Sequence, residues 1–71
     1  MIRVTVKSSA EIDSVIVTDG EAIVVAFHKR PSERMYDVTG TDEYGTHASQ
    51  ADLEAIIGGL HMRDSAGSWR G

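Results

Sequence analysis

Ala22-Ile23-Val24-Val25-Ala26-Phe27 is a continuous apolar stretch in a chain of 71 residues, and it sets the main constraint on the fold. As a strand it places apolar side chains on both faces of a sheet, because successive side chains point in opposite directions. One face is available to the single amphipathic helix that the sequence predicts downstream. We therefore expect the second face to be covered by a partner, either another copy of the chain or a ligand.

The length of the chain fits one domain over residues 1–71. Hydrophobic residues make up 41% of the sequence and charged residues 25%, which is typical of a globular domain. A domain of this size buries only about 60% of its unfolded surface, so it often depends on a disulfide, a metal or an oligomer. There is no cysteine, which excludes a disulfide and thiolate metal ligands. A homo-oligomer is the expected alternative.

The formal net charge of −4 argues against nonspecific binding to nucleic acids, which requires many phosphate contacts. No apolar stretch approaches the ~20 residues that span a bilayer, so no membrane contact is expected. The first residues, Met1-Ile2-Arg3-Val4, lack the features of a signal peptide. We expect a cytoplasmic protein.

The strand pattern predicts an antiparallel meander. Alternating apolar and polar residues, β-branched runs and turn residues indicate four strands, at about residues 2–7, 12–18, 22–28 and 33–39. The pair Asp19-Gly20 predicts a type I′ hairpin between the second and third strands, because this pair readily adopts positive φ angles. The only proline, Pro31, lies in the next predicted loop.

A single helix is expected after a loop over residues 40–47. Ser49 stands three positions before Asp52, which approximates a capping box. One apolar stripe follows at helical spacing, formed by Leu53, Ile56, Ile57 and Leu60. Gly58-Gly59 weaken the last turn, and the polar tail from Asp64 predicts that the helix has ended. The fold class is therefore α+β, with a small antiparallel sheet of about four strands and one C-terminal helix packed on one face.

Four stretches between Ser8 and Trp69 resemble the KTSC domain, a family found at the C-terminus of some lysyl-tRNA synthetases and as stand-alone bacterial and phage proteins. They are Ser8-Ser9-Ala10 with Ile12 to Val15, Ile23 to Phe27, Tyr36-Asp37-Val38-Thr39-Gly40, and Asp64-Ser65-Ala66-Gly67-Ser68-Trp69. Val38 replaces the second tyrosine of the family's central motif, and Trp69 replaces its closing tyrosine.

The resemblance implies a small antiparallel sheet with a helix, over the whole of residues 1–71, and a domain for which RNA binding has been proposed. It also implies a free-standing protein of a kind that is frequent in phages, and such a protein acts in the host cytoplasm. Sequestering a host nucleotide is one function consistent with that distribution.

Two aromatic residues are candidates for ligand stacking. Tyr36 and Trp69 each offer a face on which a nucleobase stacks, since aromatic rings accept any base. The alternative for Tyr36 is an ordinary cross-strand pair, and for Trp69 a packing contact that holds the tail to the sheet. The sequence leaves both alternatives open.

Two polar segments are candidates for binding an anion. His28, Lys29, Arg30 and Arg34 surround one hairpin and offer a guanidinium grip on a phosphate or carboxylate, or else form a solvated loop that discourages edge pairing. Backbone amides of the tail after the helix offer a cradle, or else this tail only ends the helix; the residues concerned are Ser65, Gly67, Ser68 and Arg70.

No catalytic motif is present. His28, His47 and His61 lie in separate predicted elements without neighbouring ligands, and no nucleophile elbow, phosphate loop or dinucleotide fingerprint occurs. We therefore expect no metal, no cofactor and no enzymatic activity. The leading hypothesis is a homo-oligomeric binding module for a small anionic or nucleotide-like ligand. The alternatives are a module that docks a host or phage protein through the second sheet face, and RNA binding.

Overall fold

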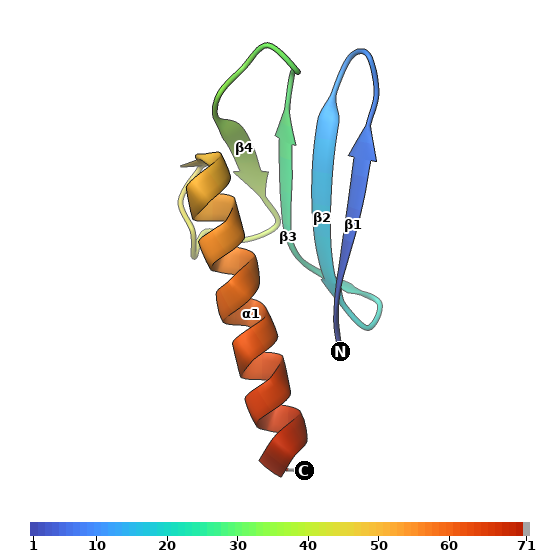
Figure 1. Cartoon of the computed structure of the whole chain (residues 1–71), viewed down its shortest axis with the longest axis vertical. Helices are drawn as coiled ribbons and strands as arrows, with labels where there is room; N and C mark the ends of the chain where they lie inside the picture. The colour runs from blue at the N-terminus through green and yellow to red at the C-terminus, as the bar shows by residue number, and fades with distance from the viewer. Residues whose placement is uncertain (71) are drawn as a thin grey trace.

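The computed structural model describes the backbone of residues 1–70 and the side chains of residues 1–64. It is an α+β fold in which an antiparallel sheet precedes one helix (Figure 1). The elements are β1 (Ile2–Ser8), β2 (Asp13–Asp19), β3 (Ala22–Lys29), β4 (Tyr36–Thr39), β5 (His47–Ala48) and α1 (Gln50–Arg70). The sheet order β1-β2-β3-β4-β5 follows the chain. The predicted fold class and meander are confirmed, with one strand more than expected.

The hairpin between β2 and β3 forms where it was predicted, but with a different turn. Asp19 pairs with Ala22, so the two central turn residues are Gly20 and Glu21. Of these only Gly20 has a positive φ, of +63°. The predicted type I′ turn is wrong, because that turn requires positive φ at both central residues. A glycine at the first central position is the arrangement that type II′ turns use.

A β-bulge in β3 changes how the apolar stretch is distributed. Val17 pairs with Val25 and Thr18 pairs with Ile23, so Val24 is an extra residue on β3. Val24 and Val25 both pack toward the core, because a bulge interrupts the strict alternation of side chains. The stretch places apolar side chains on both faces as expected, but the bulge divides them unevenly. On the face away from the helix, it contributes only Ile23 and Ala26.

The end of the sheet differs from the prediction at two points. β4 starts at Tyr36 instead of residue 33, because the main chain turns between Arg30 and Glu33, whose amide donates to the Arg30 carbonyl at 3.0 Å. β5 was not predicted, because it is only two residues long: His47 is the last residue of the expected loop, and Ala48 follows it. Its Ala48 pairs with Tyr36 and is buried.

The helix begins with the predicted capping box. The Asp52 amide donates to Ser49 Oγ at 3.1 Å, and the Ser49 amide donates to Asp52 Oδ2 at 3.1 Å. Two amide groups that would otherwise lack partners are thereby satisfied. Leu53 and Leu60 are buried, which confirms the predicted stripe.

α1 crosses the inner face of the sheet obliquely. At its start, Tyr36 Oη of β4 donates to Gln50 Oε1 at 3.0 Å. At the other side of the sheet, the Ile2 amide of β1 donates to Asp64 Oδ2 at 3.2 Å. Figure 1 shows the helix starting beside β4 and running toward the end of the molecule that holds the N-terminus. The core between helix and sheet consists of Val15, Val17, Val25, Phe27, Tyr36, Val38, Ala48, Leu53 and Leu60.

The helix continues past the point at which it was expected to end. It spans 21 residues to Arg70, and at about 1.5 Å per residue it is about 31 Å long. Gly58-Gly59 and Gly67 each cost only about 1 kcal/mol relative to alanine. No proline removes a helical hydrogen bond in this segment. The prediction of a non-helical tail from Asp64 is therefore wrong for the residues up to Arg70.

Candidate functional site

The outer face of the sheet, on the side away from α1, carries an uncharged band. On β2, Ile16 lies between the buried residues Val15 and Val17, so its side chain points away from the core. Cross-strand pairing places Ile16 between Thr5 of β1 and Ala26 of β3. The resulting band crosses four strands and is formed by Thr5, Ile16, Ala26 and Thr39, which we call the outer row. Its two threonines are exposed, Ile16 is half-buried and Ala26 is 6% exposed.

Two further rows border the outer row. Toward the β2–β3 turn lie Arg3, Thr18 and Ile23, and the Ile23 side chain is 59% exposed. Toward the other end of the sheet lie Lys7, Ser14, His28, Asp37 and His47. The outer face is therefore uncharged at its centre and polar at its borders. Sequence analysis singled out only the apolar stretch on β3. The outer row could have been predicted by aligning the outward-facing residues of all the predicted strands.

The row that starts at Lys7 contains two histidines with defined partners. His28 Nδ1 lies 2.9 Å from Ser14 Oγ on the neighbouring strand. His47 Nε2 lies 3.4 Å from Asp37 Oδ1. Both pairs connect adjacent strands at the surface, and the third histidine, His61, lies on the separate helix. Within the part of the chain that the structure describes, no group of three or more potential metal ligands is present.

The hairpin of His28, Lys29 and Arg30 borders an open hollow of about 340 Å³. Its lining includes all three of these residues together with Ile12, Glu33 and Asp37. The two carboxylates offset the positive charge that was expected to hold an anion. Arg34 is exposed but is not part of this lining.

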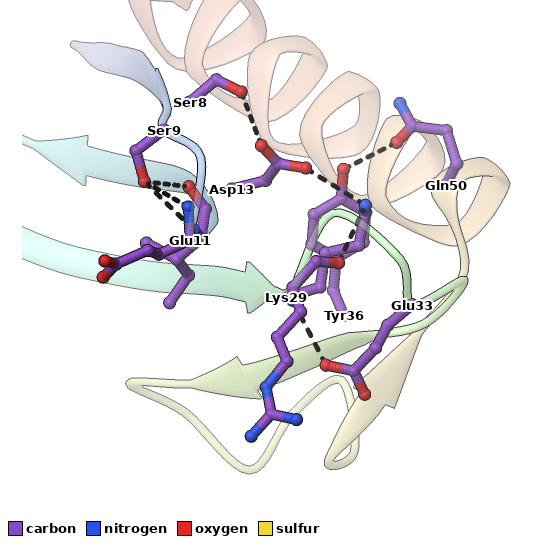
Figure 2. A network of polar contacts seen from close by, with 10 residues as sticks. Ser8, Ser9, Glu11, Asp13, Lys29, Glu33, Tyr36 and Gln50 are labelled. Carbon is purple, nitrogen blue, oxygen red and sulfur yellow. Dashed lines mark hydrogen bonds and ion pairs between the residues drawn. The ribbon is translucent and has the colours of Figure 1, made fainter.

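Lys29 takes part in a polar network at the end of the core (Figure 2). Its Nζ lies 3.2 Å from Asp13 Oδ2 and 5.4 Å from the centre of the Tyr36 ring. Asp13 also accepts a hydrogen bond from Ser8 Oγ at 2.5 Å. The Ser8 hydrogen bond and then the Lys29 ammonium lower the pKa of the Asp13 carboxyl, because both favour its charged form. The Lys29 side chain is 15% exposed, so little of it faces a ligand.

Tyr36 belongs to the core. It is 7% exposed, contacts Phe27 edge to face with ring centres 6.3 Å apart, and donates its hydroxyl hydrogen to Gln50. Of the two alternatives left open for this residue, packing is the one that the structure supports. A buried ring has no free face on which a base stacks.

The tail candidates lie in α1, far from the hairpin. The backbone of Ser65, Gly67, Ser68, Trp69 and Arg70 is helical, so their amides do not form a separate cradle after the helix. The side chains of these residues lie outside the described part of the structure. The hairpin of residues 28–34 lies at one end of the molecule and the C-terminal end of α1 at the other (Figure 1). The structure does not bring the two predicted groups together within one chain.

A second hollow, of about 260 Å³, lies along α1 beside the loop that precedes β5. It is mainly apolar and is lined by Tyr44, Ala55, Ile56, Gly59, Leu60 and Arg63. Arg63 lies 3.8 Å from Glu43 at its rim, and both side chains are mostly exposed. The hollow is shallow and contains no catalytic grouping of side chains.

No helix within residues 1–70 is both long enough and apolar enough to cross a membrane. Comparison of the chain with protein-family models, with curated proteins and with solved structures found no match.

Proposed function

We propose that the chain is a non-catalytic interaction module that binds another protein through the outer face of its sheet. The observation that carries the proposal is the outer row, an uncharged band across four paired strands on the face opposite to α1. Ile23, at 59% exposed, extends the apolar character of this face toward the β2–β3 turn. An uncharged sheet face of this kind suits a partner element that packs on a sheet, such as another sheet or a helix.

The charge of the outer face indicates the chemistry of the partner. The chain as a whole has a net charge of −4. The outer face carries Arg3 and Lys7 but only Asp37 as an acidic residue among its three rows. The expected partner is therefore a protein with an acidic surface around an uncharged centre. Two lysine or arginine side chains are too few for strong binding to a phosphate backbone.

The test begins with a photoreactive side chain at Thr39, in the outer row, and the same group at Met62 on the exposed side of α1 as a matched control. The protein that is crosslinked only from position 39 is then purified. Its affinity is measured for the wild type, Ile23→Glu and Met62→Glu. We expect Ile23→Glu to raise the Kd by about tenfold or more, since a carboxylate faces an acidic partner.

Met62→Glu should leave the Kd unchanged. Equal affinities for the two variants would exclude the outer face as the binding site. Capture of RNA instead of protein, with a complex that persists at physiological salt, would favour the RNA binding that the KTSC resemblance implies.

A small anionic ligand is the second candidate function. His28 and Arg30 at the hollow of about 340 Å³ favour it, while Glu33 and Asp37 in the same lining weigh against it. Nucleotides are titrated into the wild type, Arg30→Ala and Arg34→Ala, with melting temperature and calorimetry as readouts. Saturable binding that is lost in Arg30→Ala but kept in Arg34→Ala would support this function. The absence of any nucleotide-dependent shift in the wild type would remove it.

A further inference from the structure

The two edges of the sheet differ in length and in protection. β5 forms one edge and has two residues, whereas β1 forms the other edge and has seven. Figure 1 shows β1 as the outermost strand, on the side of the sheet away from the start of α1. β1 contains no proline, and its pairing with β2 is continuous, without a bulge. Proline and bulges are two of the devices by which proteins protect an edge strand from pairing with another chain; charged side chains are a third, and β1 carries Arg3 and Lys7.

The hydrogen bond from the Ser9 amide to the Ile12 carbonyl, at 3.0 Å, fixes which main-chain groups of β1 face outward. In an antiparallel ladder, this bond places Arg3, Thr5 and Lys7 in the pairs that exchange hydrogen bonds with β2. The amides and carbonyls of the alternate residues point away from β2; these residues are Ile2, Val4, Val6 and Ser8.

One of these outward amides is already occupied. The Ile2 amide donates to Asp64 Oδ2 of α1 at 3.2 Å, which confirms that the amides of this set face away from β2. Among the backbone of residues 1–70 and the side chains of residues 1–64, the structure records no hydrogen-bond partner for the outward amides of Val4, Val6 and Ser8. The open part of the edge is therefore the segment from Val4 to Ser8.

The same segment exposes an apolar side chain on the inner face. Val6 pairs with Val15, which is buried, yet Val6 itself is 69% exposed. Along β1, Ile2 and Val4 are half-buried beside the C-terminal part of α1, and exposure increases toward Val6. The oblique course of the helix leaves this corner of the sheet uncovered.

We propose that β1 pairs with β1 of a second copy of the chain, antiparallel and in a register centred on Val6. A two-fold axis then places Val6 opposite Val6 of the partner subunit, and Val4 opposite the partner's Ser8. Each open amide and carbonyl of the segment gains a partner, and the two exposed valines contact each other. This proposal does not depend on the function proposed above.

Charge and hydrogen bonding select this register over its neighbours. If the two-fold axis moves from Val6 to Thr5, the pairing requires the Ile2 amide, which Asp64 holds, and sets Arg3 opposite the partner's Lys7. If the axis moves from Val6 to Lys7, it sets Lys7 opposite the partner's Lys7. Like charges directly opposite each other destabilise a strand pair. In the register centred on Val6, Lys7 faces Thr5 instead.

The dimer joins two sheets into one continuous sheet and doubles the width of the outer face. Pairing through so short a segment falls below the ~1,200 Å² of a standard specific interface. We therefore expect a dimer that dissociates on dilution. Sedimentation velocity over a range of concentrations should show the sedimentation coefficient of the wild type rising from monomer to dimer.

The register is tested by charge pairing at the axis. Val6→Lys and Val6→Glu should each raise the dimer Kd by about tenfold or more, because like charges then face each other. An equimolar mixture of the two variants should restore the dimer, since residue 6 of one chain meets residue 6 of the other. Circular dichroism checks that both variants fold, and Met62→Lys is the matched control for an added exposed charge.

A wild type that stays monomeric at every concentration would overturn the dimer. Variants that dimerise as strongly as the wild type would overturn the placement of the interface at β1. Variants that are monomeric both alone and mixed would overturn the register. Ile23→Glu should still dimerise, which separates a failure of this proposal from a failure of the outer-face docking.

Discussion

α1 covers the inner face of the sheet but not the outer face, and the residues of the two faces differ accordingly. On the inner face, Val17, Val25 and Phe27 are fully buried beneath α1. On the outer face, the same two strands present Thr18, His28 and Ile23, and Ile23 is largely exposed. The bulge at Val24 is the cause of much of this difference, because it moves one valine of an apolar run to the inner side. β3 thus supplies two of the three fully buried side chains and also part of a free surface.

The largest effect is expected on the inner face. Phe27→Ala removes a fully buried ring that contacts Tyr36 edge to face. The lost burial and the cavity left behind should lower the free energy of unfolding by about 3–5 kcal/mol. For a domain this small, such a loss approaches the whole stability. Urea denaturation followed by circular dichroism measures it, and a loss below that of an exposed substitution would contradict the assignment of Phe27 to the core.

A smaller effect is expected at the polar end of the inner face, and it depends on pH. The pKa of Asp13 is lowered in the fold by Ser8 and then by Lys29. The charged carboxylate therefore contributes stability above its unfolded pKa of about 3.9, and this contribution is lost as pH falls through the folded pKa. Asp13→Asn should lower stability at pH 7 and make it less sensitive to acid.

The measurement is the urea midpoint at a series of pH values between neutral and acidic. Asp42→Asn, in an exposed loop, is the matched control and should keep the acid sensitivity of the wild type. An Asp13→Asn variant that loses as much stability on acidification as the wild type would show that the network does not contribute.

The helix that covers the inner face offers a stabilising change of modest size. Gly59 lies within α1, and a Cβ added there meets nothing within 4 Å. Gly59→Ala should raise the free energy of unfolding by about 0.5–1 kcal/mol, because alanine loses less backbone entropy in a helix. Thermal denaturation tests this change. Destabilisation would mean that the hollow beside Tyr44 requires the glycine.

The smallest effect is expected on the outer face. Ile23→Thr changes a side chain that is 59% exposed and keeps the β-branched shape that strands favour. We expect the free energy of unfolding to change by less than about 0.5 kcal/mol. Val25→Thr, two positions along the same strand but fully buried, is the matched comparison. Similar losses for the two variants would remove the distinction between the faces.

Local patterns predicted the elements of the fold well. The alternation in β1, the Asp19-Gly20 pair and the capping box of Ser49 and Asp52 each act within a few residues, so the sequence reveals them directly. The helical stripe through Leu53 and Leu60 was identified for the same reason. These features place the sheet and the helix before any tertiary contact is known.

Features that depend on pairing were missed or misjudged. The bulge at Val24 depends on how β2 and β3 align, and β5 exists only because β4 lies beside it. The candidate site was misjudged for a similar reason. Trp69 lies near the end of α1, and the length of this helix carries the C-terminal residues away from the hairpin that contains His28. Tyr36 was a candidate for base stacking but is buried in the core.

The hydrogen bond between the Ile2 amide and Asp64 has a consequence for folding kinetics. It joins two residues that are 62 positions apart, so it forms only after both the strand and most of the helix are in place. Contacts of such long sequence separation slow folding, and those made after the transition state mainly govern unfolding. Asp64→Ala removes the acceptor and should therefore speed unfolding while leaving the folding rate almost unchanged. In the wild type, we expect the Asp64 carboxylate to bind the Ile2 amide late in folding and so to hold the first residues of β1 against α1.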